Sequence, residues 1–292
     1  MRHGADRRSL QSDQVRLQIG KKLVECDRKA NEVLLTQARD SALRAGVRTR
    51  FFLLRDVLDQ RAPAASVYLF VNAFHLRTDE RTQLQAELAR NRAAAIWMYA
   101  PGYFDAVPAV ANVAETTQIK VKMFDGPAQS GSVSLLPGRW IAKDEEFGTA
   151  QEWDPLFYID DPQTDVLAKY RASKKGSVAI RFFEEGWASI FCAEPALTPA
   201  LLRDILGILE LRVCFQAGPK KFYDTTCFGP NLFAIHAKET GERIVDLDRV
   251  YDVQDLLAPE IGWPRKRTFS LSLKTGETRL LRLTPVEVEE AP

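Results

Sequence analysis

The segment from Val67 to Phe104 constrains the fold more than any other part of this 292-residue chain. It contains two short apolar runs, Val67–Val71 and Ala94–Tyr99, separated by a stretch in which Leu84 and Leu88 share one helical face. Two such strands with a helix between them form a right-handed βαβ unit, whose parallel strands are buried on both faces. Ligands bind sheets of this kind at the carboxyl ends of the strands. The sequence therefore directs attention to the two strand exits.

Neither strand exit carries a recognised catalytic motif. Asn72-Ala73-Phe74-His75 follows the first strand and Ala100-Pro101-Gly102-Tyr103 follows the second. The chain lacks the glycine patterns that bring backbone close to a pyrophosphate or a triphosphate, and it lacks a G-x-S-x-G nucleophile turn. It also contains no H-E-x-x-H and no C-x-x-C motif. We therefore expect no metal and no cofactor.

Composition excludes several classes of protein. The chain is 46% hydrophobic and 27% charged, which is ordinary for a soluble globular protein. Its 40 basic and 39 acidic residues give a net charge of +1, so no electrostatic argument favours nucleic acid or an acidic membrane as a partner. No apolar run reaches the ~18 residues of a membrane span, and the amino terminus lacks the apolar core of a signal peptide. A cytoplasmic location is the expectation.

The order of helical and strand patterns predicts an α/β domain over residues 15–218, with a three-layer, mostly parallel sheet. Residues 1–14 are expected to be disordered, and Asp125–Pro155 reads as an insertion with a hairpin around Ser132–Ile141. Helices are expected at Arg28–Ala45, Pro108–Ala114, Gln163–Ala172 and after the Thr198-Pro199 cap. Further strands are expected at Arg48–Leu54, Gln118–Phe124, Leu156–Ile159, Ser177–Phe182, Trp187–Cys192 and Leu211–Phe215.

Beyond Gly218 the pattern changes to short alternating strands, which predicts a small antiparallel β domain over residues 219–292. Two hairpins are expected there. One pairs Leu232–Ala237 with Arg243–Leu247, and the other pairs Phe269–Leu273 with Thr278–Leu283.

Several phrases of the sequence resemble a known family. These are NAFHLRTDERTQLQAELARNRAAAIWMYAPGYF, FYIDDPQTDVLAKY and GWASIFCAEPALTPALLRDILGILELRV, followed by LFAIHAKETGERIVDL and FSLSLKTGETRLLRL. Together they look like the trimerisation domain and the C-terminal β domain of bacterial β-galactosidase-like glycoside hydrolases, over roughly residues 30 to 285. The resemblance implies a fold similar to class I glutamine amidotransferases, or flavodoxin-like in outline.

The resemblance also implies an accessory or oligomerisation module that is not an enzyme on its own. The chain has no room for the catalytic barrel of ~250 residues that carries the glycosidase site. The nucleophilic cysteine and the histidine base of an amidotransferase are also missing, because Ala100-Pro101-Gly102 and Cys192-Ala193-Glu194 stand where they would be. The implied partners are another copy of the chain or a glycoside-hydrolase catalytic domain.

Two rival functions remain open. A hydrolase could use Glu194, Asp160, Asp161 and His75 at strand ends, although Asp160 and Asp161 precede Pro162 and are expected to cap the helix at Gln163–Ala172. A carbohydrate-binding module could use aromatic loop residues, because aromatic rings stack on sugars. The residues expected to contact a ligand or a neighbouring subunit are Asn72, Tyr103 and Phe104.

Overall fold

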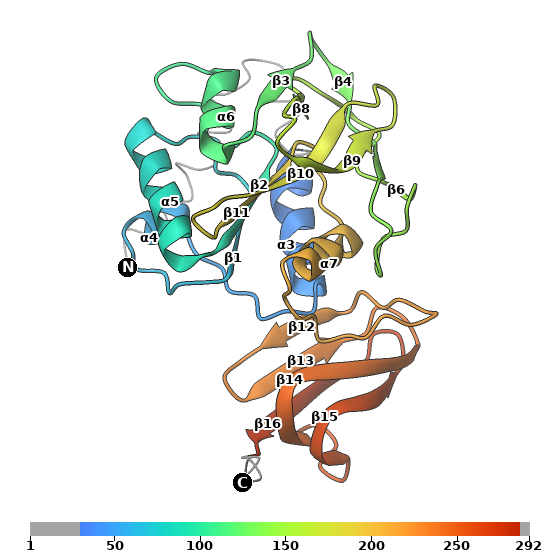
Figure 1. The fold of residues 1–292 in the computed structure, drawn as a ribbon. Coiled ribbons are helices and arrows are strands. Elements are labelled where there is room, and N and C mark those ends of the chain that lie inside the picture. The colour runs from blue at the N-terminus through green and yellow to red at the C-terminus, as the bar shows by residue number, and fades with distance from the viewer. Residues whose placement is uncertain (1–29, 287–292) are drawn as a thin grey trace. The chain divides into compact units, whose positions relative to one another are not determined.

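The computed structural model describes residues 30–286 (Figure 1), so the expected disorder of residues 1–14 lies outside the described part of the chain. The chain divides into two compact units. The described part of the first comprises residues 30–38, 52–137 and 142–197, and that of the second comprises 39–51, 138–141 and 198–286.

The first unit is built around three parallel strands, β1 (Val67–Phe70), β2 (Ala94–Met98) and β11 (Ala188–Cys192). Ala94 of β2 lies opposite Val67 of β1 on one side and Ala188 of β11 on the other. Helix α5 (Thr78–Asn91) connects β1 to β2, which confirms the predicted βαβ unit. Every residue of β2 and β11 is buried, as expected of central strands covered on both faces.

The rest of this sheet is antiparallel, so the prediction of a mostly parallel sheet is wrong. Strands β10, β9, β5 and β6 continue it from β11, and β8 pairs with β10 and with β3. These strands span Gly176–Phe182 (β10), Asp165–Tyr170 (β9), Ser132–Ser134 (β5), Glu146–Phe147 (β6), Phe157–Ile159 (β8) and Val121–Met123 (β3). A short separate pair is formed by β4 (Ala128–Gln129) and β7 (Glu152–Trp153).

The error has a specific source in the segment Gln163–Ala172. It was expected to be a helix, and it forms β9 because the buried β10 needs a second partner for its backbone groups. The hairpin expected around Ser132–Ile141 is also wrong, since β5 pairs with β6 and β9. Two further expected strands are absent from the described residues. Arg48–Leu54 leads into helix α4 (Leu54–Leu58), and Leu211–Phe215 makes a single bridge, from Phe215 to Val245.

The expected helices other than Gln163–Ala172 are present. The segment predicted as Arg28–Ala45 contains η1 (Glu32–Gln37) and α3 (Ala38–Arg44), followed by Gly46 with a φ of +72°. Helix α6 (Val110–Thr117) follows the second strand exit. Helix α7 (Pro199–Ile208) begins at the predicted cap, where the Thr198 hydroxyl accepts a hydrogen bond from the Leu201 amide. Helix α7 belongs to the second unit.

The core of the first unit contains stacked aromatic rings, and a series of hydrogen bonds fixes the position of Trp97 within it. The Trp97 ring on β2 stacks on Phe70 with centroids 4.3 Å apart. Its indole Nε1 donates to Ser189 Oγ at 3.1 Å, and Ser189 Oγ donates to the Thr117 carbonyl at 2.6 Å. These two hydrogen bonds join β2, β11 and the end of α6, so the large Trp97 side chain is buried without an unpaired donor.

The second unit contains a five-stranded antiparallel sheet in the order β12-β13-β16-β14-β15. Its strands are β12 (Thr225–Phe228), β13 (Leu232–His236), β14 (Gly241–Asp255), β15 (Gly262–Leu273) and β16 (Thr278–Pro285). The predicted strand positions are confirmed, and both predicted hairpins are wrong. β13 pairs with β12 and β16, while β15 pairs with β14, because every strand carries the same alternation and the turns do not select the partner.

A buried ion pair lies inside this sheet. Arg243 on β14 donates from Nε to Asp224 Oδ2 at 2.6 Å and from Nη2 to Asp224 Oδ1 at 3.0 Å, with both side chains essentially inaccessible. The Phe222 ring lies under the guanidinium, 4.1 Å from it. This bidentate geometry offsets the cost of removing both charges from water.

We expect Asp224→Ala to lower the free energy of unfolding by about 3 kcal/mol or more, since it leaves the Arg243 charge buried and unpaired. Urea denaturation followed by circular dichroism measures the change. The matched control is Arg267→Ala, which removes an ion pair between Asp246 and a half-exposed arginine and should cost less than about 1 kcal/mol. Equal losses in the two variants would contradict the assignment.

Candidate functional site

The two strand exits lie side by side and are joined by their own backbone. The Gly102 amide donates to the Ala73 carbonyl at 2.7 Å, and the Phe104 amide donates to the Phe74 carbonyl at 2.9 Å. The Leu76 amide then donates to the Phe104 carbonyl at 3.1 Å. His75 is half-buried and forms a parallel bridge with Phe104. The edge of the sheet at which α/β folds bind ligands is therefore occupied by a short backbone ladder.

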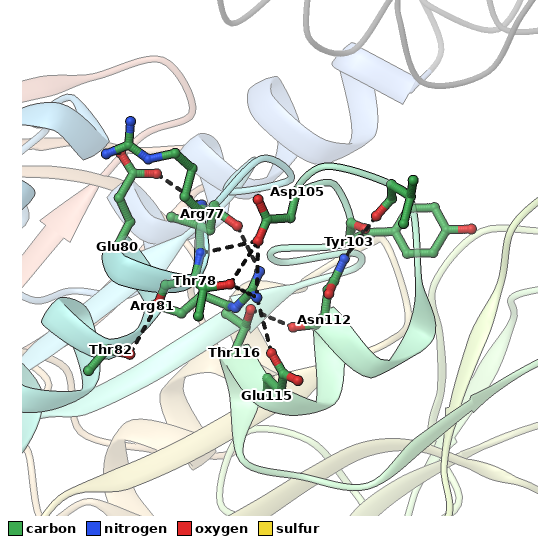
Figure 2. A network of polar contacts seen from close by, with 12 residues as sticks. Arg77, Thr78, Glu80, Arg81, Thr82, Tyr103, Asp105, Asn112, Glu115 and Thr116 are labelled. Carbon is green, nitrogen blue, oxygen red and sulfur yellow. Dashed lines mark hydrogen bonds and ion pairs between the residues drawn. The ribbon is translucent and has the colours of Figure 1, made fainter.

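Arg81 closes this edge from the α5 side (Figure 2). Its side chain is 4% exposed, and its Nη2 lies 3.2 Å from Asp105 Oδ2, 3.0 Å from Glu115 Oε2 and 2.9 Å from Thr78 Oγ1. Its Nη1 donates to the Leu76 carbonyl at 2.8 Å. The guanidinium thus connects the first exit, the start of α5, the loop after β2 and helix α6, and two carboxylates neutralise its charge.

Asp105 is the second anchor of this network. Its Oδ2 accepts hydrogen bonds from the Thr78 hydroxyl at 3.0 Å and from the Thr78 amide at 3.1 Å, at the amino-terminal turn of α5. These bonds, together with the nearby Arg81 charge, lower the pKa of Asp105. Sequence reasoning missed this network. Its signal was the placement of Arg81 on the same helical face as Leu84 and Leu88, where a charge requires a partner.

Tyr99 occupies the turn directly after β2. Its φ is +63°, which is rare for an aromatic residue and strains the backbone. The ring is buried beside Trp153, with centroids 5.1 Å apart, and the phenol donates to the Pro155 carbonyl. Burial raises the pKa of Tyr99. A buried neutral phenol that already donates a hydrogen bond cannot act as a nucleophile.

Glu194 follows β11 and is 1% exposed. Its Oε1 accepts a hydrogen bond from the Ala196 amide at 3.1 Å, and the hydroxyls of Ser130 and Ser132 each lie 3.3 Å from a carboxyl oxygen. Burial raises the pKa of Glu194 to about 8, and the hydrogen bonds limit the rise. The raised pKa is typical of a general acid, whereas the carboxyl is enclosed by protein in this structure.

The other carboxylates named from the sequence lie in separate environments. Asp160 is exposed and pairs with Lys122 at 2.7 Å. Asp161 is buried and accepts hydrogen bonds from the amides of Lys120 at 2.9 Å and Gln163 at 3.0 Å. The expected role of these aspartates as helix caps is wrong, because strand β9 follows them. Among the described residues, His75, Asp161 and Glu194 share no bonding partner.

The aromatic residues of the second exit lie at the surface. The Tyr103 ring packs edge-on against Phe157, with centroids 5.3 Å apart, and its hydroxyl lies 4.0 Å from Met123 Sδ. Figure 2 shows this ring directed away from the Arg81 network. Phe104 packs against Tyr103 and the core, and Asn72 is half-buried at the end of β1. In the same region Val107 is 67% exposed and Met123 is 40% exposed.

Within residues 30–286 no group of three or more histidine, cysteine, aspartate or glutamate side chains is arranged to hold a metal ion. None of the described helices has the length and hydropathy needed to cross a membrane.

Comparison with known proteins finds similar folds among solved structures and no match by sequence. The chain matches no protein-family model and no curated protein sequence. Among solved structures, it is similar to the β-galactosidase from Bacillus circulans sp. alkalophilus, with a TM-score of 0.59 and 11% identity over 86% of this chain and 37% of that one. It is also similar to the β-galactosidase from Rahnella sp. R3, with a TM-score of 0.54 and 8% identity over 83% and 35% of the two chains. Gan42B, a GH42 β-galactosidase, matches with a TM-score of 0.53 and 11% identity over 84% and 35%.

These matches confirm the predicted resemblance at the level of fold. The chain spans little more than a third of the length of the β-galactosidases it matches. A mixed, partly parallel sheet followed by a five-stranded antiparallel sheet is thus a fold that this chain has in common with part of GH42 β-galactosidases.

Proposed function

We propose that this chain is a non-catalytic association module of β-galactosidase-like ancestry, which joins copies of itself. The observation that carries the proposal is the fold likeness, which covers 83–86% of this chain and only 35–37% of the matched β-galactosidases. A module that corresponds to the trimerisation and C-terminal β domains would account for both fractions. Such a module would retain the surfaces that hold subunits together.

The chemistry of the strand exits supports a non-catalytic role. Nη2 of the Arg81 guanidinium contacts Asp105, Glu115 and Thr78, and Nη1 donates to the Leu76 carbonyl, so both terminal nitrogens are engaged within the protein. A glycosidase needs two carboxyl groups facing one substrate bond, about 5–10 Å apart with space between them. Glu194 is enclosed by the protein, and Asp161 is held by two backbone amides.

The exposed apolar residues at the second exit support association. Tyr103, Val107 and Met123 form what we term the exit surface, with Val107 and Met123 substantially exposed. The loop that carries Tyr103 and Val107 is fixed by Asn112, whose Nδ2 donates to both of their carbonyl oxygens at 3.1 Å. A surface held in one conformation loses little entropy on binding, which favours its use as an interface.

We expect the wild-type chain to self-associate and Val107→Asp with Met123→Asp to weaken that association at least about 100-fold, which is about 2.7 kcal/mol, because both charges would be buried without partners. Sedimentation equilibrium at micromolar concentration measures the change. These positions are preferable to Tyr103 and Phe104, whose rings pack against the core, so that their replacement would also affect folding.

The matched control is Phe182→Asp. Phe182 is 57% exposed and lies opposite Ala188, at the other end of the strands from the exits. This variant should keep the wild-type mass. A wild-type chain that remains monomeric at these concentrations would refute the proposal.

The alternative function is a hydrolase, and the raised pKa of Glu194 is the observation that favours it. On the association proposal, the purified chain should hydrolyse neither aryl β-galactosides nor glutamine. A chromogenic galactoside assay and an ammonia-release assay test this. Turnover that is present in the wild type and lost in Glu194→Gln would reverse the preference between the two functions.

A further inference from the structure

A short exposed segment covers the buried Glu194 carboxyl. We term residues Glu146–Trp153 the strap. It begins at β6, which pairs with β5, and ends at β7, which pairs with β4. The Trp153 ring is buried at one end of the strap, where its Nε1 donates to Thr149 Oγ1 at 3.1 Å, whereas Gly148, Ala150 and Gln151 are exposed.

The middle of the strap is shaped around the carboxyl. Gly148 has a φ of +95°, and a Cβ atom at this position would lie 2.6 Å from Glu194 Cδ, so no side chain fits there. The Thr149 amide donates to the Glu194 carboxyl, and the Thr149 hydroxyl lies 2.8 Å from Ser130 Oγ. The strap therefore reaches Glu194 by direct contact.

Besides the strap, the described surroundings of Glu194 offer the Ala196 amide and hydroxyl groups, and no compensating charge. Strand β5 and its lead-in provide Ser130 and Ser132, and Ser132 Oγ donates to Ser177 Oγ on β10 at 2.9 Å. The titratable neighbours are the Tyr170 phenol on β9 and the Cys192 thiol on β11.

These titratable groups supply no positive charge. Burial raises the pKa of both Tyr170 and Cys192, the latter to about 12, so both stay neutral near pH 8. The charged side chains of the strap itself are Glu146 and Glu152, which are acidic and exposed. Within residues 30–286 no cationic side chain forms a hydrogen bond or an ion pair with Glu194.

We propose that the strap is a pH-dependent closure, held shut by the protonated Glu194 carboxyl and released when that carboxyl ionises and takes up water. A protonated carboxyl can remain among serine hydroxyls beneath the strap, because it carries no net charge and both donates and accepts hydrogen bonds. An ionised carboxyl there has lost its hydration without gaining a cation. Among the described groups around Glu194, the serines, Ala196, Tyr170 and Cys192 are buried, whereas Gly148 of the strap is exposed and Thr149 is half-buried. The strap is therefore the element that can move aside.

The direction of the effect follows from linkage. The carboxyl has its ordinary pKa of about 4.3 when the strap is open, and it binds its proton more tightly when the strap is closed, with a pKa of about 8. The closed form therefore has its full stability at a pH below the open-state pKa. Between the two pKa values it loses about 1.4 kcal/mol of stability per pH unit, and above the closed-state pKa its stability falls no further.

Hydrogen exchange read by mass spectrometry on peptides that span the strap tests the proposal. After correction for the intrinsic exchange rate, protection of the strap amides should fall about tenfold per pH unit from pH 5 to 8 and then level off. Amides of β2 should stay better protected than the strap throughout, because the opening is local. Protection of the strap that is independent of pH, or equal to that of β2, would overturn the proposal.

Two variants identify the responsible group. Glu194→Gln keeps the shape and removes the charge, so the pH dependence of the strap should vanish, whereas Glu146→Gln removes an exposed charge on the strap and should leave the dependence intact. If Glu194→Gln does not fold, Ser130→Ala serves instead. It removes a hydrogen-bond donor that lowers the pKa of Glu194. The pH at which protection of the strap amides stops falling should therefore rise. An unchanged profile in Ser130→Ala would count against Glu194 as the group that titrates.

Discussion

The complete burial of strand β2 is the constraint on which the first unit depends. A strand covered on both faces must bond all its backbone groups within the sheet, and β2 does so through parallel pairing with β1 and β11. Parallel pairing places the exits of β1 and β2 side by side. The polar groups at these two exits then need bonding partners, which the backbone ladder and the Arg81 network supply. The segment after β11 places Glu194 inside the protein.

Buried ionisable side chains among the described residues are stabilised in different ways. Arg81 and Arg243 are each neutralised by carboxylates, and Arg243 has bidentate geometry with Asp224. Within residues 30–286, Arg203 forms no ion pair with a carboxylate. It donates to the carbonyls of Arg44, Ala45 and Phe222 and lies 4.1 Å from the Trp140 ring, and burial lowers its pKa to about 10. Glu194 is surrounded by hydroxyls and amides, so its protonation state depends on pH within the range that proteins encounter.

These arrangements bear directly on function. In an enzyme of this fold class, polar groups at the strand exits must be left unpaired so that a substrate can use them. Here the Arg81 guanidinium and the Asp105 carboxylate bond to groups of the protein itself, and the apolar side chains of Val107 and Met123 are exposed in the same region. The proposal of association rests on these exposed apolar side chains beside polar groups that are already bonded.

The sequence by itself determined the local elements with strong periodicity: the strands and helix of the βαβ unit, the Thr198 cap and the positions of the C-terminal strands. It did not determine β9, because Gln163–Ala172 fits either a helical or an alternating pattern and only pairing with β10 decides between them. Nor did it determine which C-terminal strands pair, since their alternation is the same. The Arg81 network and the enclosure of Glu194 join residues that lie 24 to 64 positions apart. Only the tertiary structure brings such residues together, and their chemistry depends on that proximity.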